Sequence, residues 1–172
     1  MQYKYYLHLF AGMAMLELGN LASSLAPFNV SAVSESLGAN SQESGLVVTL
    51  ELFFAAISSL FFGTVSYKGK ALAYCGSLIV ICSYFLCSIA SDVNQITFIK
   101  AFSGIGCGML IASGHSILAS SQDPNRSYAL FTLFASLTAA FLIYISSTWI
   151  EDGGHSYSVS YTHLTLPTIR LV

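Results

Sequence analysis

Residues 96–119 of the chain are ITFIKAFSGIGCGMLIASGHSILA, a stretch in which Lys100 is the only residue with a full charge. Coiled as an α-helix at 1.5 Å per residue, this stretch is about 36 Å long, enough to cross the hydrocarbon core of a bilayer, which is roughly 30 Å thick. A helix also satisfies its own backbone hydrogen bonds, as hydrocarbon demands. The stretch therefore predicts a transmembrane helix.

Four more stretches have the same character, and the composition of the whole chain agrees with them. Of the 172 residues, 55% are hydrophobic and 8% are charged, and the mean hydropathy is +0.69. A soluble domain normally has about 25% charged residues. We therefore predict an all-α integral membrane protein with five transmembrane helices, at about residues 5–30, 45–65, 71–90, 96–119 and 129–149.

The basic residues outside the predicted spans fall on one side of the membrane if successive spans alternate in direction. Lys and Arg accumulate in cytoplasmic segments. We therefore expect the N-terminus in the cytoplasm and the protein in the plasma (inner) membrane, with acidic linkers on the outer side. The basic residues are Lys4, Lys68, Lys70 and Arg126, and the acidic ones are Glu35, Glu43 and Asp92.

Several classes of function find no support in the sequence. The chain has no basic tract of the kind that binds nucleic acid, and neither a GxSG nor an HExxH sequence, so we expect no enzyme. The only cluster that suggests catalysis is Ser113, His115 and Ser116. The cysteines lack CxxC or Cys/His spacing, so we predict neither a metal site nor a cofactor and expect four small buried side chains. These are Cys75, Cys82, Cys87 and Cys107.

Three charged residues inside the predicted spans are the candidate functional residues. A charge at a helix centre costs at least about 2.5 kcal/mol of insertion free energy, so such residues usually have a function. Glu17 lies about 18 Å from the start of its span, close to the middle of the membrane. Glu51 and Lys100 lie about 9 Å and about 6 Å from the outer ends of theirs. These two can pair if their helices are neighbours.

Each candidate also has a structural interpretation. Glu17 either faces a solute cavity and carries a proton, or stays protonated and hydrogen-bonds to a neighbouring helix. Glu51 is either a carrier or a structural partner of Lys100, and Lys100 either pairs inside or extends to the outer interface. His115 is a candidate proton relay, but for both His115 and His8, near the cytoplasmic ends of their spans, interfacial packing is favoured.

The segment KAFSGIGCG, Lys100–Gly108, has a glycine pattern typical of closely packed helices. Gly104 and Gly108 form a GxxxG motif, with Gly106 between them. Small residues at this spacing let two helix backbones approach, so helix packing is the expected role.

Three motifs resemble those of the N-terminal six-helix half of the major facilitator superfamily. KAFSGIGCG is similar to the RxxxGxGxG pattern of the family's fourth span, with Lys100 at the arginine position. GTVSYKGK is a degenerate form of the GxLxDRxGRR loop that follows the second span, and DPNRSYA is similar to the PxxRxxA pattern after the fourth. The matching loop residues are Gly63, Val65, Lys68, Gly69, Lys70, Pro124, Arg126 and Ala129, while Tyr67 replaces the aspartate.

The resemblance covers about residues 5–156 and implies a secondary active transporter that works by alternating access. Glu17 and Lys100 would then face the cavity, and we expect proton-coupled transport of an unidentified small solute. The absence of the loop aspartate puts the family's usual cytoplasmic charge lock in doubt. The fifth span lacks the proline-glycine pattern of drug–proton antiporters, so drug export is not predicted. The alternative function is a small multi-span scaffold or assembly protein without transport.

The end of the chain differs from the rest. SVSYTHLTLPTIRLV, residues 158–172, is similar residue for residue to a translated transposase sequencing adapter. We therefore expect residues 1–156 to be the transporter bundle and residues 157–172 a non-native tail. The native protein would continue into a sixth span and a C-terminal half, its missing partner. Because an adapter-derived tail is not part of the natural protein, His163 and Arg170 have no predicted role.

Overall fold

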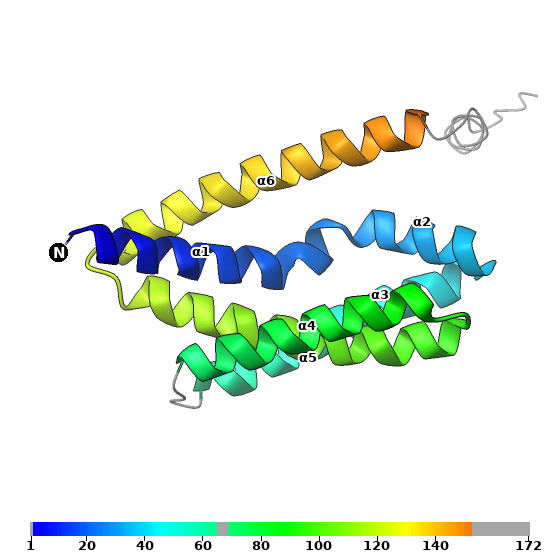
Figure 1. Cartoon of the computed structure of the whole chain (residues 1–172), viewed down its shortest axis with the longest axis horizontal. Coiled ribbons are helices and arrows are strands. Elements are labelled where there is room, and N and C mark those ends of the chain that lie inside the picture. Colours follow the sequence, from blue (N-terminus) through cyan, green and yellow to red (C-terminus); the bar gives the residue numbers. More distant parts are fainter. Residues whose placement is uncertain (1, 65–68, 153–172) are drawn as a thin grey trace, which may run out of the picture. The chain divides into compact units, whose positions relative to one another are not determined.

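The computed structural model describes residues 2–64 and 69–152, and the regular elements in these ranges are all α-helices (Figure 1). The predicted all-α fold is therefore confirmed for this part of the chain. Lys68 and the tail at residues 157–172 lie outside the described residues. The helices are α1 (Gln2–Ser24), α2 (Ala26–Leu37), α3 (Ser41–Thr64), α4 (Gly69–Ile89), α5 (Val93–Ala119) and α6 (Pro124–Asp152).

Within the described ranges, four helices are long and apolar enough to cross a membrane, and a fifth span arises if α1 and α2 count as one. The pair is bent by 49° where it breaks, so the prediction of one continuous helix over residues 5–30 is wrong. Pro27 lies in the first turn of α2; it has no backbone N–H, and its ring clashes with the carbonyl group four residues earlier. The first part of the connection predicted between the spans at residues 5–30 and 45–65 is also helical, through Leu37.

A short turn joins α2 to α3, and local interactions fix both of its ends. Gly38 ends α2 with φ +63°, a left-handed conformation that glycine adopts without a steric penalty. At the start of α3, Asn40 Oδ1 accepts the N–H of Glu43 at 2.9 Å. In return, Glu43 Oε2 accepts the N–H of Asn40 at 3.0 Å. This reciprocal arrangement is a capping box, which satisfies two otherwise unpaired donors.

The chain divides into two compact units, Met1–Phe131 and Thr132–Val172. In the first unit α5 is the central helix, because it packs against α1, α3 and α4, while α2 packs against α3. In the second unit, the described residues continue α6 from Thr132 to Asp152.

Glycines let α5 approach three helices at once. A Cβ atom added at Gly104 or Gly108 would overlap backbone atoms of α3. One added at Gly106 would lie 2.9 Å from a carbonyl oxygen of α4, and one at Gly114 would lie 2.8 Å from a carbonyl oxygen of α1. The close approach expected from the GxxxG motif is therefore present between α5 and α3, and Gly106 adds a second contact, with α4.

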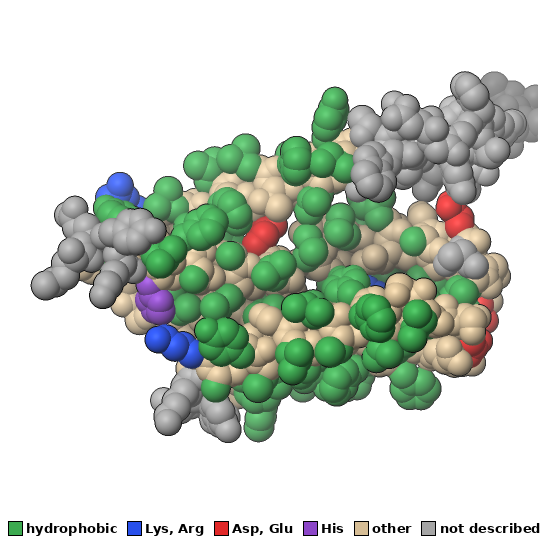
Figure 2. Space-filling model, in the orientation of Figure 1, with side chains coloured by type: hydrophobic (Ala, Val, Ile, Leu, Met, Phe, Trp, Pro, Cys, Tyr) green, Lys and Arg blue, Asp and Glu red, His purple; other side chains and the backbone are tan. Residues whose placement is uncertain are grey.

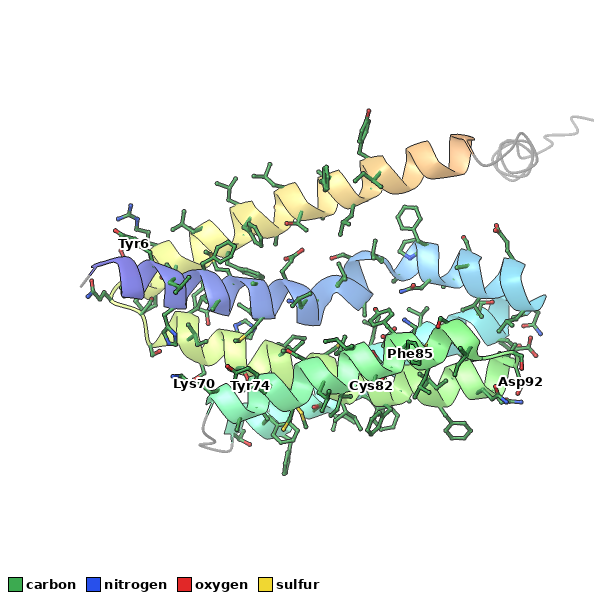
Figure 3. All side chains as sticks on the ribbon, viewed as in Figure 1. Tyr6, Lys70, Tyr74, Cys82, Phe85 and Asp92 are labelled. Carbon is green, nitrogen blue, oxygen red and sulfur yellow. The ribbon has the colours of Figure 1, made fainter. Side chains whose placement is uncertain are left out.

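The outward face of α4 is apolar, as lipid-facing surfaces are. Tyr74, Ile81 and Phe85, at helical spacing on this face, are 77%, 66% and 67% exposed; Figure 3 labels Tyr74 and Phe85 on this helix. The prediction of four buried cysteines is wrong for the three on α4, because an apolar span cannot distinguish a lipid-facing position from an inward one. Cys75 and Cys82 are exposed, Cys87 is half-buried and Cys107 is buried.

Apart from the buried Glu17, Glu51 and Lys100, the described charged side chains of the first unit gather at its two ends. Lys and Arg side chains lie at the end where α1 begins, and most Asp and Glu side chains lie at the opposite end (Figure 2). Lys70 marks the first end and Asp92 the second (Figure 3). This separation agrees with helices that cross a bilayer, since Lys and Arg concentrate on one side of a membrane.

Candidate functional site

Glu51 of α3 and Lys100 of α5 form an ion pair inside the first unit. The Nζ atom of Lys100 lies 3.2 Å from Oε2 of Glu51 and donates a hydrogen bond to Oε1 at 3.4 Å. The Glu51 side chain is 0% exposed and the Lys100 side chain 8%. The predicted pairing is therefore confirmed, and the alternative in which Lys100 extends to the membrane surface is wrong.

The position of Gly104 explains how the two helices bring these charges together. Gly104 follows Lys100 by about one turn of α5, and a Cβ atom there would overlap the carbonyl oxygen of Glu51. The glycine therefore lets the backbone of α5 lie directly against α3 at the level of the pair. Lys100 can reach Glu51 without leaving the interior of the unit.

Tyr84 of α4 is the third member of this group, which we call the Glu51–Lys100–Tyr84 cluster. The Nζ atom of Lys100 lies 4.6 Å from the centroid of the Tyr84 ring, within the range of a cation–π attraction. Tyr84 is not among the residues predicted from the sequence, because the candidates inside the spans were the charged residues and the histidines. The signal that could have found it is an aromatic hydroxyl inside an apolar span.

An apolar layer covers the cluster on the side of α2. Val47 precedes Glu51 by one turn of α3, and Ile96 precedes Lys100 by one turn of α5. Both pack with Val33 of α2 in one buried hydrophobic group. The layer separates the ion pair from that end of the unit. Surroundings of low polarity strengthen the attraction between the charges.

Two buried serines lie next to the cluster in sequence. Ser103 follows Lys100 by three residues on α5, and Ser83 precedes Tyr84 on α4. The Oγ atoms of both serines are buried without a hydrogen-bond partner among the described residues. Because a hydroxyl group can donate one hydrogen bond and accept two, these serines retain capacity to bind a polar group.

Glu17 lies on α1, apart from the cluster. It is 7% exposed, and it forms no ion pair with any side chain in the described part of the chain. Gly19, two residues further on α1, faces Cys107 and Ile111 of α5. At 1.5 Å per residue, Glu17 is therefore about 15 Å from the level of Lys100 along the helix axes. The structure buries Glu17 but does not bring it together with Lys100.

His115 lies near the opposite end of α5 from the ion pair. Its Nδ1 atom is 3.2 Å from the Oη atom of Tyr128, in the second turn of α6, and its side chain is exposed. It follows Lys100 by about 22 Å along α5. The contact joins α5 to the start of α6. The Ser113 hydroxyl donates to the Met109 carbonyl group at 2.8 Å and forms no hydrogen bond with His115.

The residues of the two loop motifs are exposed where the structure describes them. These are Gly63, Gly69, Lys70, Pro124, Arg126 and Ala129. The backbone N–H of Arg126 donates to Asp123 Oδ1 at 3.1 Å, which caps the start of α6. No ion pair links these loop residues within the described ranges.

Nothing in the described residues gathers three or more His, Cys, Asp or Glu side chains in a group that could hold a metal ion. A comparison with protein-family profiles, curated proteins and solved structures finds no match for the chain. Function is therefore inferred from the geometry of the chain itself.

Proposed function

We propose that this chain is the N-terminal bundle of a secondary active transporter of the major facilitator type, which moves a small solute through the plasma membrane with protons. The observation that carries the proposal is the Glu51–Lys100 ion pair, buried between two helices that are long and apolar enough to span a bilayer. Charges inside such helices are rare, and they mark solute and ion pathways.

A purely structural role for the pair is a weaker explanation. Apolar residues of similar volume are often as stabilising as a buried ion pair, because removing two charges from water costs much of what their attraction returns. A scaffold has no need to keep Glu51 and Lys100 in helices that otherwise present apolar side chains. A carrier does need them, because charged groups recognise its solute or its coupling ion.

The proposed roles in solute binding and proton coupling follow from the positions of the residues. Lys100 and Glu51, with the hydroxyl groups of Ser83 and Ser103, bind polar groups of the solute when the pair opens. Glu17, near the middle of the membrane, binds and releases the coupling proton as its surroundings change from dry to wet. The basic end of the unit faces the cytoplasm.

The motif residues support a major facilitator assignment. Gly104, Gly106 and Gly108 stand at the glycine positions of the family's fourth span, and here they lie against α3 and α4. Lys100 stands at the position of the family's arginine and points to a carboxylate inside the unit. A second bundle of the same carrier would supply the other wall of the solute site.

The test uses the complete natural protein in liposomes with an imposed pH gradient. A panel of radiolabelled solutes, such as glucose, glutamate and tetraphenylphosphonium, identifies one that accumulates above the level in empty liposomes. The Glu17→Gln variant then loses accumulation driven by the gradient, and the exposed-site variant Glu35→Gln keeps it. Undiminished proton-driven accumulation in Glu17→Gln contradicts the role of Glu17. If no solute of a broad panel accumulates, the scaffold alternative is favoured.

A further inference from the structure

A pocket with a volume of about 140 Å³ opens at the basic end of the first unit. It lies between the start of α1, the α5–α6 connection and the first turns of α6. All of its lining residues belong to the unit Met1–Phe131. Six of them are Tyr5, Tyr6, Leu9, Gln122, Arg126 and Leu130.

The lining is apolar on one side and polar on the other. Leu9 is buried in the hydrophobic group that joins α1, α5 and α6, and Leu130 adds a second aliphatic side chain. Tyr5 and Tyr6 are in edge-to-face contact, with ring centroids 5.5 Å apart. Tyrosines at the end of a membrane span favour the headgroup region, because their rings are apolar and their hydroxyl groups are polar.

Arg126 supplies a positive charge to the pocket. Its side chain is exposed and forms no ion pair with the side chains that the structure describes. Asp123 also lines the pocket, but its Oδ1 atom accepts the backbone N–H of Arg126 at 3.1 Å. One oxygen of this carboxylate therefore caps α6, and the guanidinium group forms no ion pair with Asp123.

We propose that this pocket binds the headgroup of an anionic phospholipid. The guanidinium group of Arg126 pairs with the phosphate, since its planar fork matches phosphate oxygens. Tyr5 and Tyr6 lie beside the glycerol and phosphate, and the first methylene groups of an acyl chain follow Leu9 and Leu130. In a bilayer, lipid headgroups surround the ends of the helices, where the pocket lies. Anionic phospholipid is therefore next to the pocket wherever the protein is inserted in a membrane that contains it.

The proposal is independent of transport, because it concerns only the edge of the unit. A basic side chain near a membrane surface attracts anionic lipid with an energy that corresponds to about a fivefold preference. A pocket with aromatic and aliphatic walls adds positioning to this attraction. We therefore expect a specifically bound lipid that remains with the protein through purification, rather than non-specific enrichment of anionic lipid around it.

Native mass spectrometry of the full chain tests the inference. The protein is purified in detergent and mixed with equal amounts of phosphatidylglycerol and phosphatidylcholine. Arg126→Gln lowers the ratio of phosphatidylglycerol to phosphatidylcholine adducts about fivefold. This substitution keeps the backbone N–H that Asp123 caps. The matched control is Lys70→Gln, at the same end of the unit on α4 and outside the pocket; it leaves the ratio unchanged.

Three results overturn the proposal. An equal loss of phosphatidylglycerol adducts in Arg126→Gln and Lys70→Gln means that general surface charge, not the pocket, attracts the lipid. Complete displacement of the adduct by millimolar inorganic phosphate means that the site binds a free anion rather than a lipid. A third variant, Tyr6→Leu, removes one wall of the pocket and keeps the charge. Its ratio falls if the pocket binds the lipid, and an unchanged ratio contradicts that assignment.

Discussion

Breaking the Glu51–Lys100 pair from either side destabilises the protein, and removing both charges restores it. The perturbation is a double-mutant cycle of Lys100→Met, Glu51→Gln and the double variant. Because the two side chains are 8% and 0% exposed, each single variant leaves a buried group that must be neutralised or remain unpaired. Removing one partner of a buried pair costs about 3–5 kcal/mol of the free energy of unfolding.

An independent estimate of scale comes from the cost of neutralising the remaining group. A carboxylate that titrates near pH 4.3 in water costs about 3.7 kcal/mol to protonate at pH 7, at 1.36 kcal/mol per pH unit. An ammonium group that titrates near pH 10.4 in water costs about 4.6 kcal/mol to deprotonate. Both costs fall within the range of about 3–5 kcal/mol expected for a broken buried pair. The double variant lies within about 1 kcal/mol of the natural protein or is more stable.

The assay is SDS-induced unfolding in mixed micelles, followed by modification of a buried thiol. Cys107 is buried, whereas the other three cysteines are exposed or half-buried, so these three are first replaced by serine. Exposed-site controls are Glu35→Gln and Lys70→Met, which change the unfolding free energy by less than about 0.5 kcal/mol. Single variants as stable as these controls, or a double variant less stable than both singles, would refute the assignment of a buried, mutually dependent pair.

Further variants at Gly104, Asn40 and Tyr84 test helix packing, helix capping and the cation–π contact in the same unfolding assay. Gly104→Ala lowers the unfolding free energy by about 1–3 kcal/mol, because the added Cβ atom overlaps the backbone of α3. The control Gly45→Ala, with open space around the added atom, raises it by up to about 1 kcal/mol. Equal effects of the two substitutions would contradict the close approach of α5 to α3. Asn40→Ala removes one side of the capping box and costs about 1 kcal/mol, and no change would mean that the cap is not formed in the membrane protein. Tyr84→Leu costs about 0.5–2 kcal/mol while Tyr84→Phe, which keeps the ring, costs less; identical losses would exclude a cation–π contribution from the contact with Lys100.

Features that depend on local chemistry were predictable from the sequence. Hydrocarbon requires each crossing segment to be long and apolar on its own, so the positions of the helices followed from residue type. The similar depth of Glu51 and Lys100 allowed them to pair, but that α3 and α5 are neighbours came only from the structure. Pro27 lies inside the first predicted span, and a proline in the interior of a helix kinks or breaks it. The break between α1 and α2 could therefore have been predicted from the sequence.

Features that depend on which face of a helix turns inward were not predictable. Cys82 and Ser83 are adjacent on α4, but Cys82 is exposed and Ser83 is buried. Lipid is as apolar as a protein interior, so hydropathy does not distinguish the two faces. The separation of Glu17 from Lys100 likewise depends on how α1 packs against α5. The spacing of apolar residues along one sequence does not predict which parts of two helices lie side by side.

The sequence of the intact gene, read from source DNA across the codon for Ser156, tests the central claim most directly. If the chain is the N-terminal bundle of a secondary transporter, the natural reading frame continues into a sixth apolar span, a central loop and a second set of six spans. A natural stop codon directly after the fifth span would contradict the claim and favour a small membrane scaffold.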